Sequence, residues 1–261
     1  MNSDSCNPSA QTMRDKTYFI SDLHLGAGYI ADTYSHQRRI AAWLRSIAPT
    51  ASRLFLLGDV IDYWYEYRDV VPRGFVRFFG ALAELADSGV EITWLKGNHD
   101  IWIFDYLPTE LGINVADGII TRDLDGKTFV MEHGDGVGEV RNSYRLMRRV
   151  FRNRMCQRLY SAIHPRWTVG FAHRWSTHSR ATSSYISPSV LPDTDPLVVF
   201  ANDYLRSGHH ADYFIFGHRH TPAERRVGPD GCATLMVLGD AFSHFNYAVW
   251  DGNTLRMETI S

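Results

Sequence analysis

The 261-residue chain has few cysteines and no long apolar run. Its three cysteines, Cys6, Cys156 and Cys232, are odd in number and far apart, which does not fit a disulfide framework and favours a reducing cytoplasm. No apolar stretch approaches the roughly 20 residues that are needed to cross a bilayer. Residues 1–16 are polar and lack the apolar segment of a signal peptide, so we expect them to form a disordered leader.

The chain as a whole also lacks a large net charge. The net charge is −2, which argues against a general nucleic-acid binder, and we expect no nucleic-acid partner. Hydrophobic residues make up 44% of the chain, which is enough for one substantial core. The sequence therefore predicts a single domain at residues 17–261.

Five short polar blocks each follow an apolar run, directly or after one residue. Such runs, bounded by Gly and polar residues, are typical of buried strands, and open α/β sheets bind ligands at the carboxyl ends of their strands. The blocks are Asp22-Leu23-His24, Gly58-Asp59, Gly97-Asn98-His99-Asp100, His133-Gly134-Asp135 and Gly217-His218-Arg219-His220. The apolar runs before them are 18–20, 54–57, 92–95, 129–131 and 213–216.

The side chains of these blocks are oxygen and nitrogen donors. Without a thiolate they suit Mn²⁺, Fe, Zn²⁺ or Mg²⁺, and they do not fit a closed zinc site of the cysteine type. On a strand, Asp22 and His24 would point to the same face, because strand side chains alternate with a period of two. The same relation holds for His218 and His220, so each pair could reach a common metal ion.

Two divalent ions would account for the remaining donors. The Asp59 carboxylate could bridge the ions, and the Asn98 amide could add an oxygen without adding charge. Two ions about 3.5–4 Å apart hold the attacking and leaving oxygens of a phosphoryl transfer and lower the pKa of a bound water, so no Ser or Cys nucleophile is needed. The first two blocks alone are common as a strand end or a turn, and the blocks that begin at Gly97 and Gly217 are rarer, but chance does not explain all five in order.

The order of the blocks resembles the calcineurin-like metallophosphoesterase superfamily over roughly residues 17–251. The resemblance implies that one ion is bound by Asp22, His24, Asp59 and His220, and the other by Asp59, Asn98, His133 and His218. It also implies that His99 stabilises the phosphoryl oxygens or protonates the leaving group, and that Asp100 orients His99. Mn²⁺ is the metal that we expect. We expect Asp62 to contact a metal ligand without binding the metal itself, and Asp135 to form a hydrogen bond near His133.

Longer stretches are similar to the UDP-2,3-diacylglucosamine hydrolases within that superfamily. They are "YFISDLHLG", "LFLLGDVIDYW", "DSGVEITWLKGNHD", "MEHGD" followed by Tyr144, and "VLGDAF". The resemblance implies cleavage of the pyrophosphate of a UDP-linked diacylated sugar in lipid A synthesis, giving UMP and the lipid monosaccharide phosphate. The best-known branch of these enzymes has Arg at the position of His99, whereas His is the general choice of the superfamily.

Two alternatives stay open at this point. The first is another calcineurin-like phosphodiesterase or phosphatase that acts on a soluble nucleotide or phosphoester, and that would need no apolar site for acyl chains. The second is a metal-free scaffold for protein binding. Such a scaffold should have lost ligands, whereas all seven candidate ligands are present here.

Helical and strand patterns alternate up to about residue 100, and strands then follow one another. Periodic apolar residues predict helices at residues 31–47 and 76–85, with Pro49 ending the first. Residues 112–133 contain no helical pattern, and further strands are expected at 213–216, 235–238 and 247–250. We therefore predict an α/β fold of the four-layer α+β/α type, with two packed mixed β-sheets flanked by helices.

A basic insertion, residues 141–191, interrupts this pattern, and we name it the cap. It holds ten arginines, no lysine and no acidic residue, so it carries +10 and the rest of the chain carries −12. A helix here would place Leu146, Met147, Val150 and Phe151 on one side, and Arg141, Arg145, Arg148 and Arg152 on the other. The plain interpretation is a basic surface without a role. The functional interpretation is a helical cap that holds an anionic, lipid-linked nucleotide sugar.

The cap also has features of a membrane-surface segment. Basic side chains contribute about 1 kcal/mol each near anionic lipid, and Trp167, Phe171 and Trp175 are ring types favoured at the interface. We therefore expect peripheral association with the inner face of the cell membrane. The expected substrate-binding residues are Tyr144, Arg141, Arg145, Arg148, Arg152, Ser179 and Arg180.

Overall fold

The computed structural model describes residues 14–138, 142–168, 170 and 190–260. The expected leader lies outside these residues except for its last three positions, and the first strand begins at Lys16. Arg141, Ser179 and Arg180 of the predicted substrate contacts also lie outside them, as do Phe171 and Trp175.

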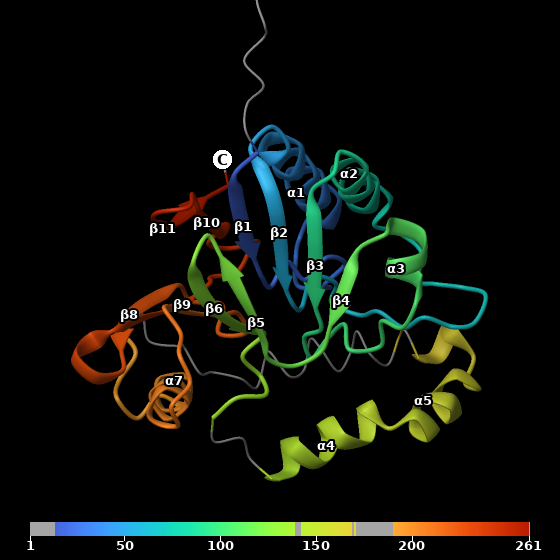
Figure 1. The fold of residues 1–261 in the computed structure, drawn as a ribbon. Coiled ribbons are helices and arrows are strands. Elements are labelled where there is room, and N and C mark those ends of the chain that lie inside the picture. Colours follow the sequence, from blue (N-terminus) through green and yellow to red (C-terminus); the bar gives the residue numbers. More distant parts are fainter. Residues whose placement is uncertain (1–13, 139–141, 169, 171–189, 261) are drawn as a thin grey trace, which may run out of the picture.

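Two mixed β-sheets form the centre of the fold (Figure 1). The six-stranded sheet has the order β11-β10-β1-β2-β3-β4. Strands β1 to β4 run parallel to one another, β10 runs antiparallel to β1, and β11 runs antiparallel to β10. Its strands are β1 (Lys16–Ile20), β2 (Ala51–Leu57), β3 (Glu91–Leu95), β4 (Asn114–Ala116), β10 (Asn246–Trp250) and β11 (Leu255–Thr259). This sheet contains the first three predicted strands.

The five-stranded sheet has the order β5-β6-β7-β9-β8, with β6, β7 and β9 parallel. Strands β5 and β8 run antiparallel at its two edges. The strands are β5 (Ile120–Leu124), β6 (Lys127–Glu132), β7 (Tyr213–Phe216), β8 (Ala223–Val227) and β9 (Ala233–Val237). A single 3₁₀ turn, η1 (Pro229–Gly231), joins β8 to β9.

Successive side chains of a strand point to opposite faces of the sheet, so each apolar run contributes to two cores. In β2, Leu54 and Leu56 belong to the core under the helices, whereas Phe55 and Leu57 belong to the core between the sheets. The strands are therefore buried on both faces, which is why they read as continuous apolar runs instead of alternating ones. Buried rings such as Phe19, stacked on Phe55 at 5.4 Å between centroids, fill the space between the sheets.

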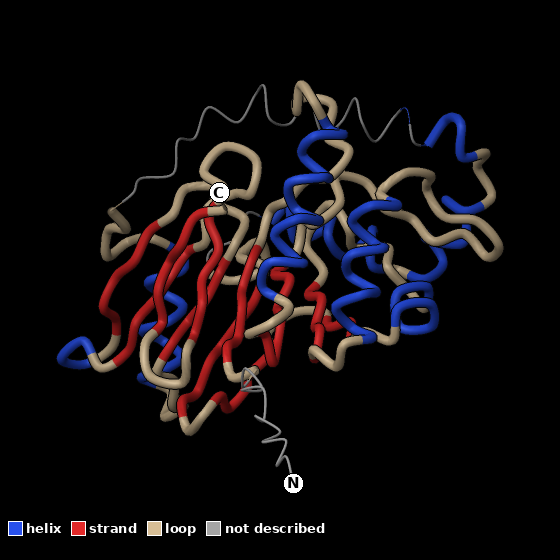
Figure 2. Tube along the Cα trace, turned by 90° about the horizontal axis from the view of Figure 1, so that it is seen from above, coloured by secondary structure: helices blue, strands red, loops and turns tan. Residues whose placement is uncertain are grey.

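Helices cover the outer faces of both sheets, and Figure 2 shows them outside the strands. Helix α1 (Thr33–Ile47) and helix α2 (Val76–Asp87) pack on the six-stranded sheet, and α7 (Pro196–Arg206) packs on the other. The short helix α3 (Tyr106–Leu111) precedes β4. The two predicted helices and the predicted α/β fold with two mixed sheets are confirmed. Helix α1 begins two residues later than predicted, because the Asp32 carboxylate caps it.

The described part of the cap contains α4 (Asn142–Arg152) and α5 (Arg154–Ser161). Both helices lie beyond the carboxyl ends of β1, β2 and β3 (Figure 1). Across the ranges that the structure describes, no helix is both long and apolar enough to cross a bilayer. The cap therefore stands over the sheet edge at which the polar blocks were predicted to meet.

Candidate metal centre

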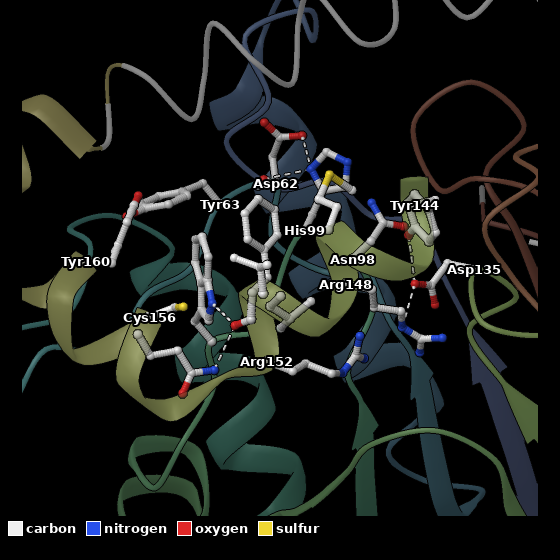
Figure 3. Close-up of a pocket in the computed structure, with 16 residues that line it drawn as sticks. Asp62, Tyr63, Asn98, His99, Asp135, Tyr144, Arg148, Arg152, Cys156 and Tyr160 are labelled. Atoms are coloured by element: carbon white, nitrogen blue, oxygen red, sulfur yellow. Dashed lines mark hydrogen bonds and ion pairs between the residues drawn. The ribbon is translucent and has the colours of Figure 1, made fainter. Parts of the chain in front are cut away.

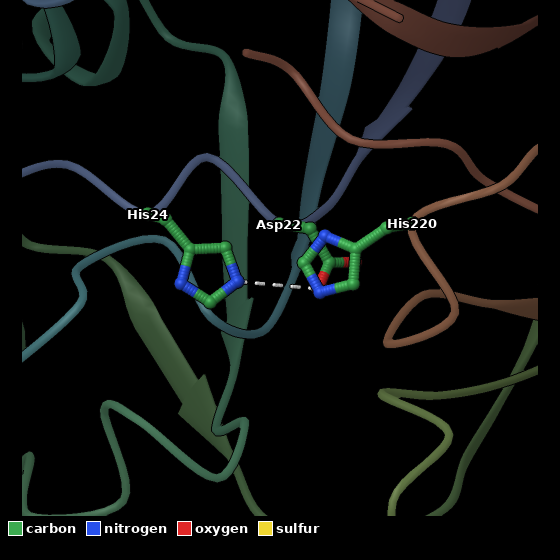
Figure 4. Close-up of side chains that lie close together, drawn as sticks. All are labelled: Asp22, His24 and His220. Carbon is green, nitrogen blue, oxygen red and sulfur yellow. Dashed lines mark ion pairs between the residues drawn. The ribbon is translucent and has the colours of Figure 1, made fainter. Parts of the chain in front are cut away.

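The five predicted blocks lie in loops that follow β1, β2, β3, β6 and β7, and we call them the metal-centre loops. Three groups of side chains meet there, each with ligand atoms within 4.8 Å of one another, and one of them, His24, Asp59 and His99, shares a residue with each of the other two. The first ligand group is Asp22, His24 and His220, shown in Figure 4. The second ligand group contains Asp59, His133 and His218, and the Asn98 amide oxygen lies 3.2 Å from His133 Nε2.

The backbone brings these side chains together in a way that strand alternation does not. Strand β1 ends at Ile20, so Asp22 and His24 do not lie on a strand and the predicted reason for their shared face is wrong. Left-handed backbone brings the ligands together instead. The φ angles are 54° at Asp22, 44° at His24, 52° at Asp59, 67° at His218 and 57° at His220. Such conformations are unfavourable for residues other than Gly and gather at functional sites.

Glycines let the metal-centre loops approach one another closely. A Cβ atom at Gly97 would collide with the backbone nitrogen and carboxylate of Asp59. A Cβ atom at Gly217 would collide with the Ser21 hydroxyl and the Asp22 carboxylate. The glycines before Asn98 and His218 are therefore required by packing between neighbouring loops, because a larger residue would push the ligands apart.

The carboxylate of Asp59 faces both ligand groups. Its Oδ2 atom lies 3.7 Å from His24 Nε2 and 3.2 Å from His133 Nε2, while its Oδ1 atom accepts a hydrogen bond from the His99 backbone at 2.8 Å. Burial alone would raise the pKa of Asp59, but the surrounding imidazoles outweigh burial and hold the pKa well below its usual value. One oxygen of an ionised carboxylate is thus available to two cations.

The carboxylate of Asp22 has a similar arrangement in the first ligand group, with one oxygen held by hydrogen bonds and the other facing imidazoles. Its Oδ2 atom accepts hydrogen bonds from the Ser21 hydroxyl at 2.7 Å and from the His218 backbone at 2.8 Å. Its Oδ1 atom lies 3.5 Å from His220 Nε2 and 3.7 Å from His24 Nε2. Burial would raise the pKa of Asp22, but His220 and the other nearby imidazoles outweigh it and lower the pKa.

These residues fit a pair of bound cations. Among the described residues, Asp22 Oδ1, His24 Nε2 and His218 Nδ1 are buried and make no hydrogen bond. Polar atoms in a protein interior are normally paired, so unpaired ones call for an explanation. Ligand bonds of about 2.1 Å place two donors on one ion within about 4.2 Å of each other. The separations of 3.5 to 3.7 Å around Asp22 Oδ1 satisfy this limit.

The far nitrogens of two candidate ligands are held by other groups. His24 Nδ1 lies 3.2 Å from Asp62 Oδ1, and His133 Nδ1 lies 2.8 Å from the Leu57 carbonyl. A hydrogen bond on the far nitrogen fixes the ring and leaves Nε2 free to bind a metal. Asp62 therefore has the supporting position expected from the sequence.

His99 lies beside the ligands and faces the space under the cap. Its Nδ1 atom lies 2.9 Å from the Asp62 carbonyl and 3.3 Å from Asp62 Oδ1. Burial lowers the pKa of His99, but the carboxylates of Asp59 and Asp62 outweigh burial and raise it to about 9. An imidazole held in this position by Asp62 suits a group that stabilises a phosphoryl oxygen or gives a proton to a leaving group.

The prediction that Asp100 orients His99 is wrong. The Asp100 carboxylate accepts hydrogen bonds from the Val60 backbone at 2.9 Å, from Trp94 Nε1 at 3.1 Å and from the Gly97 backbone at 2.7 Å. It therefore ties two metal-centre loops together, and Asp62 orients His99 instead. Asp62 follows Asp59 by three positions, and this spacing was the one signal for it in the sequence.

A cavity of about 540 Å³ lies between the cap helices and the metal-centre loops (Figure 3). Asn98 and His99 stand at the polar end of this cavity. Its remaining wall is largely apolar and includes Ile101, Trp102, Met147, Val150, Phe151 and Tyr160. The cavity joins an apolar space to the side chains that would act on a phosphate.

Two cap arginines face this cavity and are already paired. Arg148 lies 3.4 Å from both Glu132 Oε1 and Asp135 Oδ2, and Arg152 binds Asp117 with contacts of 2.8 and 3.2 Å. The expectation that the apolar and the basic residues of α4 face different surroundings is therefore wrong. Met147, Phe151, Arg148 and Arg152 all line the cavity, whereas Leu146 is 60% exposed.

Tyr144 and Arg145 differ in their surroundings. The Tyr144 hydroxyl donates a hydrogen bond to Asp135 Oδ2 at 2.9 Å and lines the cavity, and Arg145 is exposed. Asp135 thus takes part in hydrogen bonding beside His133, as expected. Sequence reasoning missed Glu132 and Asp117, because nothing in their local sequence marks them as partners of cap arginines.

Clustered oxygen and nitrogen donors at the edge of two packed sheets define a metal-dependent hydrolase of phosphoesters. A family model described as calcineurin-like phosphoesterase matches residues 16–222, and the chain belongs to that family.

Three relatives carry the name UDP-2,3-diacylglucosamine hydrolase. The protein from Porphyromonas gingivalis is 43% identical, with 95% of this chain and 98% of the relative covered. The protein from Serratia proteamaculans is 30% identical, covering 85% and 90%, and that from Nitrosococcus oceani is 31% identical, covering 86% of each.

Proposed function

We propose that this protein hydrolyses the pyrophosphate bond of UDP-2,3-diacylglucosamine to UMP and 2,3-diacylglucosamine 1-phosphate. The observation that carries the proposal is the apolar cavity that begins at His99 and Asn98. A soluble nucleotide or phosphoester carries no long alkyl chain to fill such a space, whereas a diacylated substrate does. The names of the three similar relatives support the same substrate.

The candidate ligands divide between two metal ions, for which we propose Mn²⁺. Asp22, His24, Asp59 and His220 would hold one ion, and Asp59, Asn98, His133 and His218 the other. When bound, such a pair polarises the phosphoryl group and activates water. The donor set of carboxylates, imidazoles and one amide suits this kind of metal.

The protein's own side chains position and protonate the substrate. His99, held by Asp62, donates a hydrogen bond to a phosphoryl oxygen or a proton to the leaving oxygen. The apolar wall that includes Trp102 and Phe151 excludes water and holds the acyl chains. Tyr144 and Arg148 lie at the same end of the cavity as His99 and are placed to contact the sugar or the phosphates.

We further propose that the cap selects the substrate within a single domain at residues 17–261. Arg145 and Arg152 would add positive charge near the diphosphate. The proposed contacts Arg141, Ser179 and Arg180 lie outside the described residues. The cap is basic and the rest of the chain acidic, so it is the natural part of the molecule to attract an anionic substrate.

The outer surface of the cap supports peripheral association with the inner face of the cell membrane. Apolar side chains are exposed at every fourth position, namely Met155 (72%), Leu159 (67%), Ile163 (44%) and Trp167 (72%). Exposed arginines stand among them at positions 154, 158 and 166. Basic and apolar side chains together are typical of surfaces that lie on anionic lipid. Co-sedimentation with anionic vesicles, lost when Leu159 and Trp167 are both replaced by Ser, tests this part of the proposal.

A comparison of two substrates tests the proposed reaction. We expect release of UMP from UDP-2,3-diacylglucosamine in detergent micelles, and little release from UDP-N-acetylglucosamine, which lacks the long acyl chains. Treatment with EDTA should abolish the activity and Mn²⁺ should restore it. Equal rates on the two substrates would contradict the proposal that the cavity binds acyl chains. Full activity in EDTA would contradict the proposal that the reaction requires metal ions.

A further inference from the structure

We propose that His36 of helix α1 is a positioning residue for the first ligand group. Its Nε2 atom lies 2.8 Å from the carbonyl oxygen of Leu23, the residue between the ligands Asp22 and His24. His36 is not one of the candidate ligands and does not line the cavity, so it would act through this carbonyl. The inference rests on the proposed function, because it concerns the metal pair of that reaction.

The turn that carries Asp22 and His24 has an unfavourable backbone conformation. The φ angles of 54° and 44° lie in the left-handed region, which residues other than Gly adopt only where surrounding contacts hold them. The Asp22 carbonyl accepts a hydrogen bond from the Ala241 backbone at 3.2 Å, whereas the Leu23 carbonyl accepts one from the His36 side chain. The conformation of the turn therefore depends on which residue stands at position 36.

The His36 ring is buried and fixed in place. It is 6% exposed, and its centroid lies 6.4 Å from that of the Phe245 ring in an edge-on arrangement. Arg39 covers the Phe245 ring at 3.5 Å and donates a hydrogen bond to the Ile260 carbonyl at 2.7 Å. Burial lowers the pKa of His36, so the ring is neutral at neutral pH. Its single N–H must then lie on Nε2, because a carbonyl oxygen can only accept.

Leu23 is held on two sides, and the ligands are its direct neighbours. Its side chain is fully buried in the core under the helices, and its carbonyl is held by His36. His36 lies in the first turn of α1, where its backbone N–H donates to the Asp32 carbonyl at 3.0 Å. A shift of the Leu23 carbonyl would therefore change the separation of Asp22 Oδ1 and His24 Nε2, which is 3.7 Å.

Substitutions at position 36 separate the hydrogen bond from simple packing. His36→Gln places an amide N–H near the position of Nε2 and can keep the hydrogen bond. His36→Asn ends near the position of Nδ1 and cannot reach the Leu23 carbonyl, and His36→Leu has no donor. Leu44→Ala, at a fully buried site two turns further along α1, controls for a general loss of stability.

We would measure the Mn²⁺ affinities of the full-length protein by calorimetry and the state of the bound ions by electron paramagnetic resonance. The wild type, His36→Gln and Leu44→Ala should bind both ions and give the spin-coupled signal of a bridged pair. His36→Asn and His36→Leu should bind one of the ions roughly 10- to 100-fold more weakly, the usual effect of removing a group that orients a ligand. At a Mn²⁺ concentration that fills both sites of the wild type, they should show the signal of isolated Mn²⁺.

Wild-type affinities for both ions in His36→Asn would overturn the positioning role, and this comparison decides even if His36→Leu does not fold. An equal loss in His36→Gln and His36→Asn would also overturn it, because the hydrogen bond would then not matter. So would an equal loss in Leu44→Ala, which would reflect stability alone. Hydrolysis of UDP-2,3-diacylglucosamine by the wild type is measured separately. A wild type that binds both ions without cleaving this substrate would contradict the proposed function and not the role of His36.

Discussion

The metal-centre loops and the cap are held in place by different kinds of contact. Besides the Asp100 carboxylate, backbone hydrogen bonds join the loops, such as Asp22 to Gly58 at 3.1 Å and His24 to Asp59 at 2.9 Å. The cap is attached through side chains, including the Arg152 ion pair with Asp117. Backbone contacts do not depend on side-chain identity, whereas side-chain contacts change with single substitutions. The difference suggests that the loops fix the chemistry and that the cap determines which molecule receives it.

The largest effect should follow from removing the carboxylate that faces both ligand groups. Asp59→Ala should lower kcat/KM by more than roughly 100-fold, the upper range for groups one step removed from a metal. Bound metal, measured by elemental analysis, should fall with the activity because both proposed ions share this ligand. Asp69→Ala, an exposed carboxylate ten positions later, should leave both quantities unchanged. An Asp59→Ala enzyme with full metal content would contradict the bridging role.

His99 allows chemistry to be separated from metal binding within the same loops. His99→Ala should lower kcat by about 10²- to 10⁴-fold, the usual contribution of a general acid. Metal content should stay at the wild-type level, because the His99 ring binds Asp62 and is not one of the proposed ligands. Loss of metal in this variant would show that His99 is a ligand and that its role has been misassigned.

A pair of variants distinguishes attachment of the cap from direct contact with substrate. Arg152→Gln should raise the KM for UDP-2,3-diacylglucosamine by roughly tenfold, within the range of one charge-assisted hydrogen bond. Hydrolysis of bis(p-nitrophenyl) phosphate should be unaffected. Asp117→Asn should reproduce the change if Arg152 acts by holding the cap, and should have no effect if Arg152 binds the diphosphate. Arg149→Gln, an exposed arginine of the same helix, is the control. Equal losses on both substrates would contradict a role limited to the cap.

The smallest effect concerns the stability of the cap itself. The Asn153 side chain accepts hydrogen bonds from the Met155 and Cys156 backbones and so caps helix α5. Asn153→Ala should destabilise this helix by about 1 kcal/mol. Hydrogen exchange of the α5 amides should become faster, while exchange in the metal-centre loops should not change. Faster exchange in both regions would show that the cap and the loops are not independent.

The candidate metal ligands could be predicted from sequence because each lies in a short block next to its strand. His133, for example, follows its strand directly and Asp59 follows its strand after one glycine, and the fold brings these strand ends together. The left-handed backbone at Asp22 and His24 could not be predicted, since hydrogen bonds to distant loops impose it.

The contacts of the cap could not be predicted from the sequence. The periodicity of α4 gave a correct helix, but it could not tell which side would face the domain. The partners that turn Arg148 and Arg152 inward are Glu132 and Asp117, which come from other parts of the chain. Asp100 was misassigned for the same reason, because its partner Val60 is near it only in the folded protein.

The most direct test of the division between loops and cap is one ratio of rates. It is kcat/KM for UDP-2,3-diacylglucosamine divided by kcat/KM for bis(p-nitrophenyl) phosphate, measured in the wild type and in Met147→Glu. Met147 lines the apolar cavity, so a charge there should obstruct acyl chains and leave the metal centre intact. Val76→Glu, at a site that is 78% exposed, is the control. We predict that Met147→Glu lowers the ratio by more than roughly tenfold, since burying a charge against apolar chains is unfavourable, with the diester rate unchanged. An unchanged ratio in Met147→Glu would contradict the account.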